Sequence, residues 1–298
     1  MSVPRPVIPG QTYLLTRRCF GRTFLLRPSP KINQIFKYCL AVAAARTGIL
    51  LHAYGALSNH YHLVATDPLG NLPRFMHWLN EYVAKCVNAE LGRWESFWAP
   101  GSYSSVALDD HEDVVDKLVY VYANPVDAAL VSTLEDWPGA RSLPSDLDGH
   151  EETLCRPRGF FRENGPVPER ATLKLVTPPS CAAKGPEFLP MLISRLAERE
   201  TELQEAVRRK GRRFLGRRRV LAQSPFGRPR SVEPRRGLNP RVAARDKWRR
   251  IESLRRLKGF LSAYRSAWNR FAKGDRSATF PHGTYLMRVR FGVPCGGT

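Results

Sequence analysis

The stretch with the clearest potential for chemistry is Ser-Asn-His-Tyr-His-Leu-Val, residues 58–64, in which one residue separates His60 from His62. The surrounding pattern predicts a β-strand, and residues two apart on a strand project from the same face. Two neutral imidazoles on one face can bind a divalent metal ion. Histidines that only pack also occur at this spacing, so the spacing alone leaves both interpretations open.

A second stretch, Tyr-Val-Tyr-Ala-Asn-Pro at residues 120–125, adds a nucleophile to these candidates. On a helix, Tyr120 and Asn124 lie one turn apart on the same face. A tyrosine hydroxyl can act as a covalent nucleophile, and an amide oxygen one turn away could complete a metal site begun by two histidines. Alternatively, the tyrosines are ordinary packed aromatics and Asn124-Pro125 is an ordinary helix stop.

Hydrophobic periodicity and turn residues predict the elements that position these motifs. The expected strands are 13–18, 49–57, 61–66 and 103–108, and the expected helices are 31–47, 71–91 and 111–123, the last stopped by Pro125. The order is β-α-β-β-α-β with an extra helix. The sequence therefore predicts an α+β fold with a ferredoxin-like antiparallel sheet and an added helix that carries the tyrosine.

The chain has 298 residues and a formal net charge of +20, and this charge is unevenly distributed. Residues 1–150 contain 13 basic and 14 acidic side chains, whereas residues 201–298 contain 26 and 6. Such a cationic segment favours a polyanionic partner, most simply nucleic acid. The expected phosphate-binding residues are Arg208, Arg209, Lys210, Arg212, Arg213, Arg217, Arg218 and Arg219.

The rest of the second half is predicted to be mainly helical. Helices are expected at 187–209 and 241–271, and the alternating tail 283–291 suggests a strand. Trp248 lies on the apolar stripe of the second helix, where packing is favoured over stacking on an unpaired base. The sequence thus divides into residues 1–145, a linker or irregular extension at 146–186, and a basic DNA-binding region at 187–298.

Several classes of protein are not expected. No apolar run is long enough to span a bilayer, and the N-terminus lacks the apolar core of a signal peptide. The six cysteines are scattered without a Cys-x-x-Cys pair, which favours reduced thiols over a zinc site.

Taken together, the two motifs resemble those of the single-tyrosine HUH transposases, most closely the REP-associated tyrosine transposases. In that family an Asn-His-x-His motif on a central strand binds a divalent metal ion, and a Tyr-x-x-x-Asn-Pro motif lies on a helix. Residues 59–62 and 120–125 match these motifs, and the resemblance covers about residues 8–145. Ala129 stands where the family commonly has glycine, a difference that we expect to matter little.

The resemblance implies a transposase that cleaves and rejoins single-stranded DNA during transposition or recombination. Tyr120 would attack a phosphodiester to form a 5′-phosphotyrosine and release a 3′-hydroxyl. Mg²⁺ or Mn²⁺ would be held by His60, His62 and Asn124. The implied partner is single-stranded or hairpin DNA, and the implied location is the bacterial cytoplasm, in association with the nucleoid.

Alternatives remain open from the sequence. Tyr122 is the second candidate for the nucleophile, and the same scaffold could serve a non-catalytic nucleic-acid-binding protein or a replication-initiator or relaxase-like HUH nuclease. The sequence does not decide between a monomer and a homodimer. Structural roles are expected for His52, His77 and Asn59, and the acidic residues that open the third helix are expected to complement its dipole.

Overall fold

The structure, a computed structural model, describes residues 4–230 and 240–296 of an α+β protein. Its main sheet has five strands in the order β2-β3-β1-β4-β7. The first part of the chain forms β1 (Gln11–Arg18), α1 (Pro30–Thr47), β2 (Leu50–Leu57), β3 (His60–Asp67), α2 (Leu72–Glu90), β4 (Ser104–Leu108) and α3 (His111–Asp127). The predicted β-α-β-β-α-β order followed by a helix is therefore confirmed, and most ends lie within two residues of those expected.

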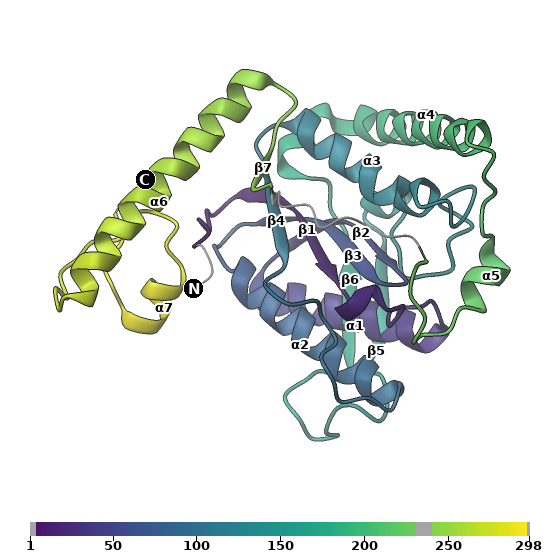
Figure 1. The fold of residues 1–298 in the computed structure, drawn as a ribbon, viewed down its shortest axis with the longest axis horizontal. Helices are drawn as coiled ribbons and strands as arrows, with labels where there is room; N and C mark the ends of the chain where they lie inside the picture. Colours follow the sequence, from purple (N-terminus) through teal and green to yellow (C-terminus); the bar gives the residue numbers. More distant parts are fainter. Residues whose placement is uncertain (1–3, 231–239, 297–298) are drawn as a thin grey trace.

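The central strand β1 pairs antiparallel with both β3 and β4, and β2 pairs antiparallel with β3. Figure 1 shows α1 and α2 on one side of this sheet and α3 with α4 on the other. Local chemistry explains why α1 begins and ends where it does. The side chain of Ser29 caps its first turn by accepting from the Ile32 amide, and Gly48 ends it at a φ of 72°.

Helix α3 continues past the point where the sequence analysis expects it to stop. Pro125 lies inside the helix, which runs on to Asp127. A proline inside a helix removes one backbone hydrogen bond and can bend the helix without ending it, and Pro125 stands in the last turn. The sequence 120–125 therefore lies entirely on one helix.

The second half of the chain adds elements around this core. These are β5 (Glu151–Cys155), β6 (Arg170–Lys174), α4 (Phe188–Arg209), α5 (Arg217–Leu221), β7 (Val242–Ala243), α6 (Lys247–Ala272) and α7 (Leu286–Phe291), with short 3-10 segments at Phe20–Arg22, Pro144–Leu147 and Pro179–Glu187. The hairpin β5–β6 packs against α1, and α4 packs against α3. One hydrophobic core includes residues from both sides of the expected boundaries at 145 and 187, among them Leu154 and Leu192. The three-part division of the chain stays a prediction.

The C-terminal tail differs from its prediction. Residues 286–291 form the short helix α7 instead of a strand, and Gly292 ends it at a φ of 62°. The alternating sequence permits either structure. Burial of Met287 in a small separate cluster with Phe271 and Phe280 accompanies the helical form.

Among the residues that the structure describes, no helix is both long enough and apolar enough to cross a membrane.

Candidate active site

The two histidines of residues 58–64 lie on one face of β3, as their spacing predicts. Across the β1–β3 ladder, His60 is opposite Arg18 and His62 is opposite Thr16. The imidazole rings of His60 and His62 have centroids 4.9 Å apart and are nearly perpendicular. Two adjacent strands thus place two imidazoles, a guanidinium and a hydroxyl on the same face of the sheet.

Hydrogen bonds set the orientation of both imidazoles. The amide nitrogen of Asn59 donates to the backbone oxygen of Arg22 at 3.2 Å, so its oxygen Oδ1 faces Nδ1 of His60 at 2.6 Å. An amide oxygen only accepts, and the proton of this imidazole therefore lies on Nδ1. On His62, Nδ1 lies 2.8 Å from the hydroxyl of Thr16, which can likewise accept. Nε2 of His60 then carries the lone pair that a metal ion needs, and Nε2 of His62 carries it when the Thr16 hydroxyl accepts.

The environment keeps His62 neutral. Its side chain is 5% exposed. Burial, with smaller effects of His60 and Arg18, lowers the pKa of His62 well below the ordinary value for histidine. A neutral imidazole at physiological pH is the form that binds metal ions.

Tyr120 reaches this face from α3. Its hydroxyl lies 3.5 Å from Nε2 of His62, and the two rings have centroids 5.1 Å apart. Its side chain is 39% exposed, so a substrate can approach it. Burial of the ring and the charge of Asp127 raise the pKa of the Tyr120 hydroxyl, while a hydrogen bond with Asn124 and the charge of Arg18 act in the opposite direction.

Asn124 lies one turn after Tyr120 on α3 and is 7% exposed. Its amide is close enough to the Tyr120 hydroxyl to oppose the rise in the pKa of that hydroxyl. Helix α3 packs directly on β2 here, because a Cβ on Gly55, the partner of His62 in the ladder, would be in ordinary van der Waals contact with the backbone oxygen of Val121 at 3.5 Å. The i and i+4 spacing therefore places the amide beside the hydroxyl that contacts His62.

The alternative nucleophile Tyr122 lies in the core. It is 1% exposed, and its hydroxyl donates to the backbone oxygen of His52 at 3.4 Å. Burial raises its pKa far above the ordinary tyrosine value. A DNA strand has no access to this hydroxyl, so the structure favours Tyr120.

The donor set can be compared with what a metal ion requires. In the part of the chain that the structure describes, no group of three or more His, Cys, Asp or Glu side chains is arranged to hold a metal ion. The candidate active site, which we define as His60, His62, Tyr120 and Asn124, instead offers two imidazoles, an amide and a phenol. These donors fit a divalent ion with mixed nitrogen and oxygen ligands, and they suit Mn²⁺ better than Mg²⁺, which prefers oxygen alone.

The eight predicted phosphate-binding residues are all exposed, at the end of α4, in the following loop and on α5. None of them forms an ion pair with a carboxylate of the described residues. The segment containing α5 docks beside the candidate active site, because the amide of Leu215 donates to the oxygen of Ala129 and the side chain of Ser58 donates to Gln223 at 3.1 Å. Three of the exposed arginines thus lie on a helix fixed next to the β2–β3 turn.

Helix α6 differs, because several of its basic side chains are already paired. Arg249 pairs with Asp110, and Arg256 pairs with Asp109. Just before the helix, Arg245 pairs with Asp116 at 3.2 Å. The acidic residues at the start of α3, expected only to complement the helix dipole, also anchor the C-terminal basic region. Less of the charge of α6 is therefore available to a nucleic acid than its composition indicates.

The remaining aromatic and histidine candidates also have clear positions. His52 is fully buried, with its two nitrogens 2.7 Å from the oxygen of Val176 and from the hydroxyl of Thr66, which fits the expected structural role. His77 is exposed on α2 and pairs with Glu81. Trp248 was expected in the core, but it is 73% exposed, since only the later part of α6 packs on the C-terminal cluster.

Sequence reasoning missed two residues of this face, Thr16 and Arg18. Both lie on β1, far from either motif in the sequence, and only strand pairing brings them there. It also undervalued Ala129, which has a φ of 54°. This left-handed conformation favours glycine, so an alanine here is strained. The glycine common at this position in the family that the motifs resemble was the available signal.

No family model matches this chain, and no curated protein gives a significant match. Among solved structures, the chain is similar to a REP-associated tyrosine transposase bound to a REP hairpin, with 21% identity and a TM-score of 0.41, over 59% of this chain and 99% of that one. It is also similar to a protein from Deinococcus radiodurans R1 provisionally named a transposase, with 20% identity and a TM-score of 0.30, over 39% of this chain and 93% of that one.

Proposed function

We propose that the chain is a DNA strand transferase of the single-tyrosine HUH type, built on a ferredoxin-like core, that cleaves and rejoins single-stranded or hairpin DNA in transposition or recombination. One observation carries the proposal. Tyr120 is exposed, and its hydroxyl lies 3.5 Å from Nε2 of a neutral histidine on the strand that also carries His60. A nucleophile beside two metal-binding nitrogens is the arrangement that phosphodiester cleavage by tyrosine requires.

In the proposed reaction, the oxygen of Tyr120 attacks a DNA phosphorus, and the bond from phosphorus to the 3′-oxygen breaks. The leaving 3′-oxygen takes up a proton, the phenolic proton is lost to solvent, and the 5′-phosphate stays on the tyrosine. A second 3′-hydroxyl reverses these steps and joins a new strand. The energy of the broken bond is retained in the phosphotyrosine, so no nucleotide hydrolysis is needed.

His60, His62 and Asn124 would hold the divalent ion, and Asn59 and Thr16 would fix the two rings through their Nδ1 atoms. Such an ion supplies positive charge that polarises the scissile phosphate and favours the phenolate. The charge of Arg18 opposes the rise in the pKa of Tyr120 that burial causes. We assign Arg18 to stabilising negative charge on the attacking oxygen and the phosphate.

The DNA strand would approach over the exposed arginines of α5 and of the end of α4. The segment that carries them is hydrogen-bonded to the β2–β3 turn and to the turn that follows α3, the helix of Tyr120. Phosphate contacts of this kind supply affinity without reading sequence. We place the protein in the bacterial cytoplasm with the nucleoid.

A non-catalytic nucleic-acid-binding protein on the same scaffold would not require the tyrosine to be exposed and held beside neutral histidines. A replication-initiator or relaxase-like nuclease would share the cleavage step, and it differs in the DNA that it processes. Cleavage therefore separates the proposal from the first alternative, and strand joining on hairpin ends separates it from the second.

The test is to incubate the protein with Mn²⁺ and single-stranded hairpin DNA and to look for a covalent adduct on a denaturing gel. The wild-type protein should form the adduct, Tyr120→Phe should form none, and Tyr122→Phe should retain it. Absence of an adduct with every hairpin tested, while the metal is bound, would refute the enzymatic proposal.

Metal binding has a readout that does not depend on activity. Isothermal titration calorimetry should show one Mn²⁺ site in the wild-type protein, and His62→Ala should weaken the affinity by about tenfold or more because it removes a ligand. The matched control is His77→Ala, which changes an exposed histidine on α2 and should leave the affinity unchanged. Equal binding by His62→Ala and the wild-type protein would move the metal site elsewhere.

A further inference from the structure

A cavity of about 620 Å³ lies between the N-terminal segment, the β4 edge of the sheet and α6. It is separate from the candidate active site, because Tyr13 on β1 lines it whereas Thr16 on the same strand faces His62. Residues three apart on a strand project from opposite faces. The volume lies within the range of sites for small organic ligands.

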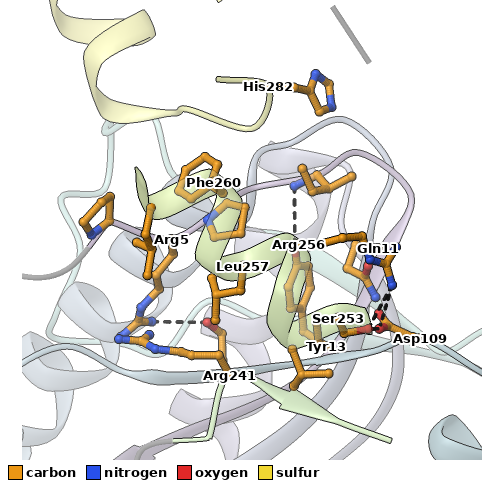
Figure 2. Close-up of a pocket in the computed structure, with 17 residues that line it drawn as sticks. Arg5, Gln11, Tyr13, Asp109, Arg241, Ser253, Arg256, Leu257, Phe260 and His282 are labelled. Carbon is orange, nitrogen blue, oxygen red and sulfur yellow. Dashed lines mark hydrogen bonds and ion pairs between the residues drawn. The ribbon is translucent and has the colours of Figure 1, made fainter. Parts of the chain in front are cut away.

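Two arginines at one end of the cavity have no carboxylate partner among the described residues. Figure 2 shows the guanidinium groups of Arg5 and Arg241 near each other, and the charge of Arg241 together with burial lowers the pKa of Arg5. The Nη1 atom of Arg241 is buried without a hydrogen-bond partner. Placing two like charges together and leaving a buried donor unpaired both cost free energy, and an anion between them would offset both costs.

Both arginines are held in place. Arg5 donates to the side chain of Ser105 at 3.2 Å and lies over the ring of Tyr103. Arg241 directly precedes β7, and its backbone oxygen accepts from the amide of Ala107 on β4. The guanidinium of Arg5 and the backbone of Arg241 are thus fixed, and guanidinium groups suit a phosphate, which accepts several hydrogen bonds at once.

The third arginine and the one carboxylate of the cavity balance each other. Arg256 lies 3.3 Å from Asp109, which also accepts from the hydroxyl of Ser253. The carboxylate is therefore already paired and does not cancel the charge of the two arginines at the other end.

Much of the remaining wall is apolar and aromatic, with Gln11 and His282 as its further polar residues. Helix α6 contributes Leu257, Phe260 and Leu261, and the sheet contributes the ring of Tyr13. Such walls accommodate a flat ring by stacking and apolar contact. The cavity thus combines a dianion site with a compartment for a ring, which are the two halves of a nucleotide.

We propose that this cavity binds one nucleotide unit, with its phosphate between Arg5 and Arg241 and its base against Phe260 and Leu257. The unit can come from a free nucleotide or from an unpaired position in a DNA strand. Since the cavity lies on the opposite face of the sheet from Tyr120, a nucleotide held there is not the one that is cut. The site is thus a second contact point, independent of the cleavage chemistry.

The test uses the full chain without divalent metal, so that no strand transfer occurs. Calorimetric titration with thymidine monophosphate and with a short oligothymidylate should give saturable binding of one nucleotide unit per chain. Tighter binding of the oligonucleotide identifies a DNA strand as the source only where Arg241→Gln removes the difference, since the arginines of α5 bind DNA outside the cavity, and equal binding identifies a free nucleotide. Inorganic phosphate should compete with both.

Variants separate the two halves of the site. Arg241→Gln and Arg5→Gln should each weaken nucleotide binding by about tenfold or more. Phe260→Ala should weaken nucleotide binding and leave the binding of inorganic phosphate unchanged. The matched control, Arg265→Gln, removes one exposed charge from α6 outside the cavity and should change the affinity by less than about twofold.

Thermal unfolding without ligand gives a second readout. Arg241→Gln should not lower the melting temperature of the free protein, because it relieves like-charge repulsion and removes the unpaired donor. The proposal is overturned if neither probe binds, if both Arg→Gln variants bind like the wild-type protein, or if a fatty acid binds through Arg241 more tightly than the nucleotide. None of these outcomes depends on whether Tyr120 cleaves DNA.

Discussion

At the scale of single residues, the two short motifs already define most of the candidate active site. Strand alternation places His60 and His62 on one face, and helical spacing stacks Tyr120 over Asn124. The sequence ranks Tyr120 above Tyr122 because only Tyr120 shares a helical face with Asn124, but it could not show that the Tyr122 hydroxyl is out of reach of a substrate. Burial separates them, and burial depends on which face of α3 meets the sheet.

Thr16 and Arg18 could not be assigned from sequence for a related reason. Neither residue type on a strand signals a function by itself. Their positions opposite His62 and His60 follow only from the β1–β3 register, which joins residues more than forty positions apart. Local sequence patterns do not show which distant strands pair, so they could not place Thr16 and Arg18 beside the histidines.

The buried imidazole of His52 predicts a pH dependence of stability. Burial lowers the pKa of His52 to about 4, from 6.5 when it is exposed. As pH falls below about 6.5 the unfolded chain takes up a proton here that the folded chain does not accept until about pH 4, so folding stability decreases over this range. Between pH 7 and pH 5 this single group should reduce the free energy of unfolding by about 2 kcal/mol.

Urea unfolding at the two pH values checks this prediction. His52→Gln removes the titrating group, so its stability should decrease less between pH 7 and pH 5 than that of the wild-type protein. His77→Gln, at an exposed position, should show the wild-type decrease. An identical pH dependence in all three proteins would contradict the assigned role of His52.

At the scale of elements, the strands and helices of residues 11–127 are predictable because each has a strong apolar pattern and clear end signals, such as Ser29 and Gly48 around α1. The tail at 286–291 is not, since its alternating residues suit a strand and only tertiary packing of Met287 accompanies a helix. The docking of α6 on the start of α3 is also absent from local sequence, because its ion pairs join residues far apart in the chain.

The turn after α3 provides a test of local backbone conformation. Ala129 has a φ of 54°, whereas its neighbour Ala128 has a φ of −73°. Glycine at position 129 relieves the strain of the left-handed conformation. Glycine at position 128 relieves no strain and only increases the conformational entropy of the unfolded chain. Ala129→Gly should therefore be less destabilising than Ala128→Gly by about 1 kcal/mol, although Ala129 is the more buried residue.

Chemical denaturation of the two variants measures this difference directly. Helix α3 carries Tyr120 and Asn124. The turn after it also holds the segment that leads to α5, because the amide of Leu215 donates to the backbone oxygen of Ala129. If Ala129→Gly proves the more destabilising variant, the left-handed turn is not the source of strain.

At the scale of the whole molecule, the basic residues behind the net charge of +20 fall into two groups, one paired with carboxylates and one exposed. Around α6 part of it pairs with the carboxylates that open α3, and around α5 it stays exposed beside the candidate active site. Composition alone predicted a polyanionic partner but could not show this division. The division makes the α5 region the better candidate for contact with DNA.

Salt dependence of DNA binding tests this division. Replacing Arg217, Arg218 and Arg219 with Gln should flatten the slope of log affinity against log salt by about 2 for single-stranded DNA, since each phosphate contact contributes about 0.7. Replacing the exposed α6 residues Arg250, Arg255 and Arg265 with Gln removes the same charge. This variant should change the slope by less than about 1, which is half of the change expected for the α5 variant. Fluorescence anisotropy at several salt concentrations gives both slopes, and equal effects would contradict the preferred role of α5.

The central claim is that Tyr120 forms a covalent bond to the 5′-phosphate of cut DNA. Trypsin cleaves after Lys117 and Arg141, so one peptide, residues 118–141, contains both candidate tyrosines. Fragmentation mass spectrometry of this peptide, isolated from protein that has reacted with Mn²⁺ and hairpin DNA, locates the attached nucleotide. The account predicts the added mass on Tyr120, and an added mass on Tyr122, or on any other residue of the chain, would contradict it.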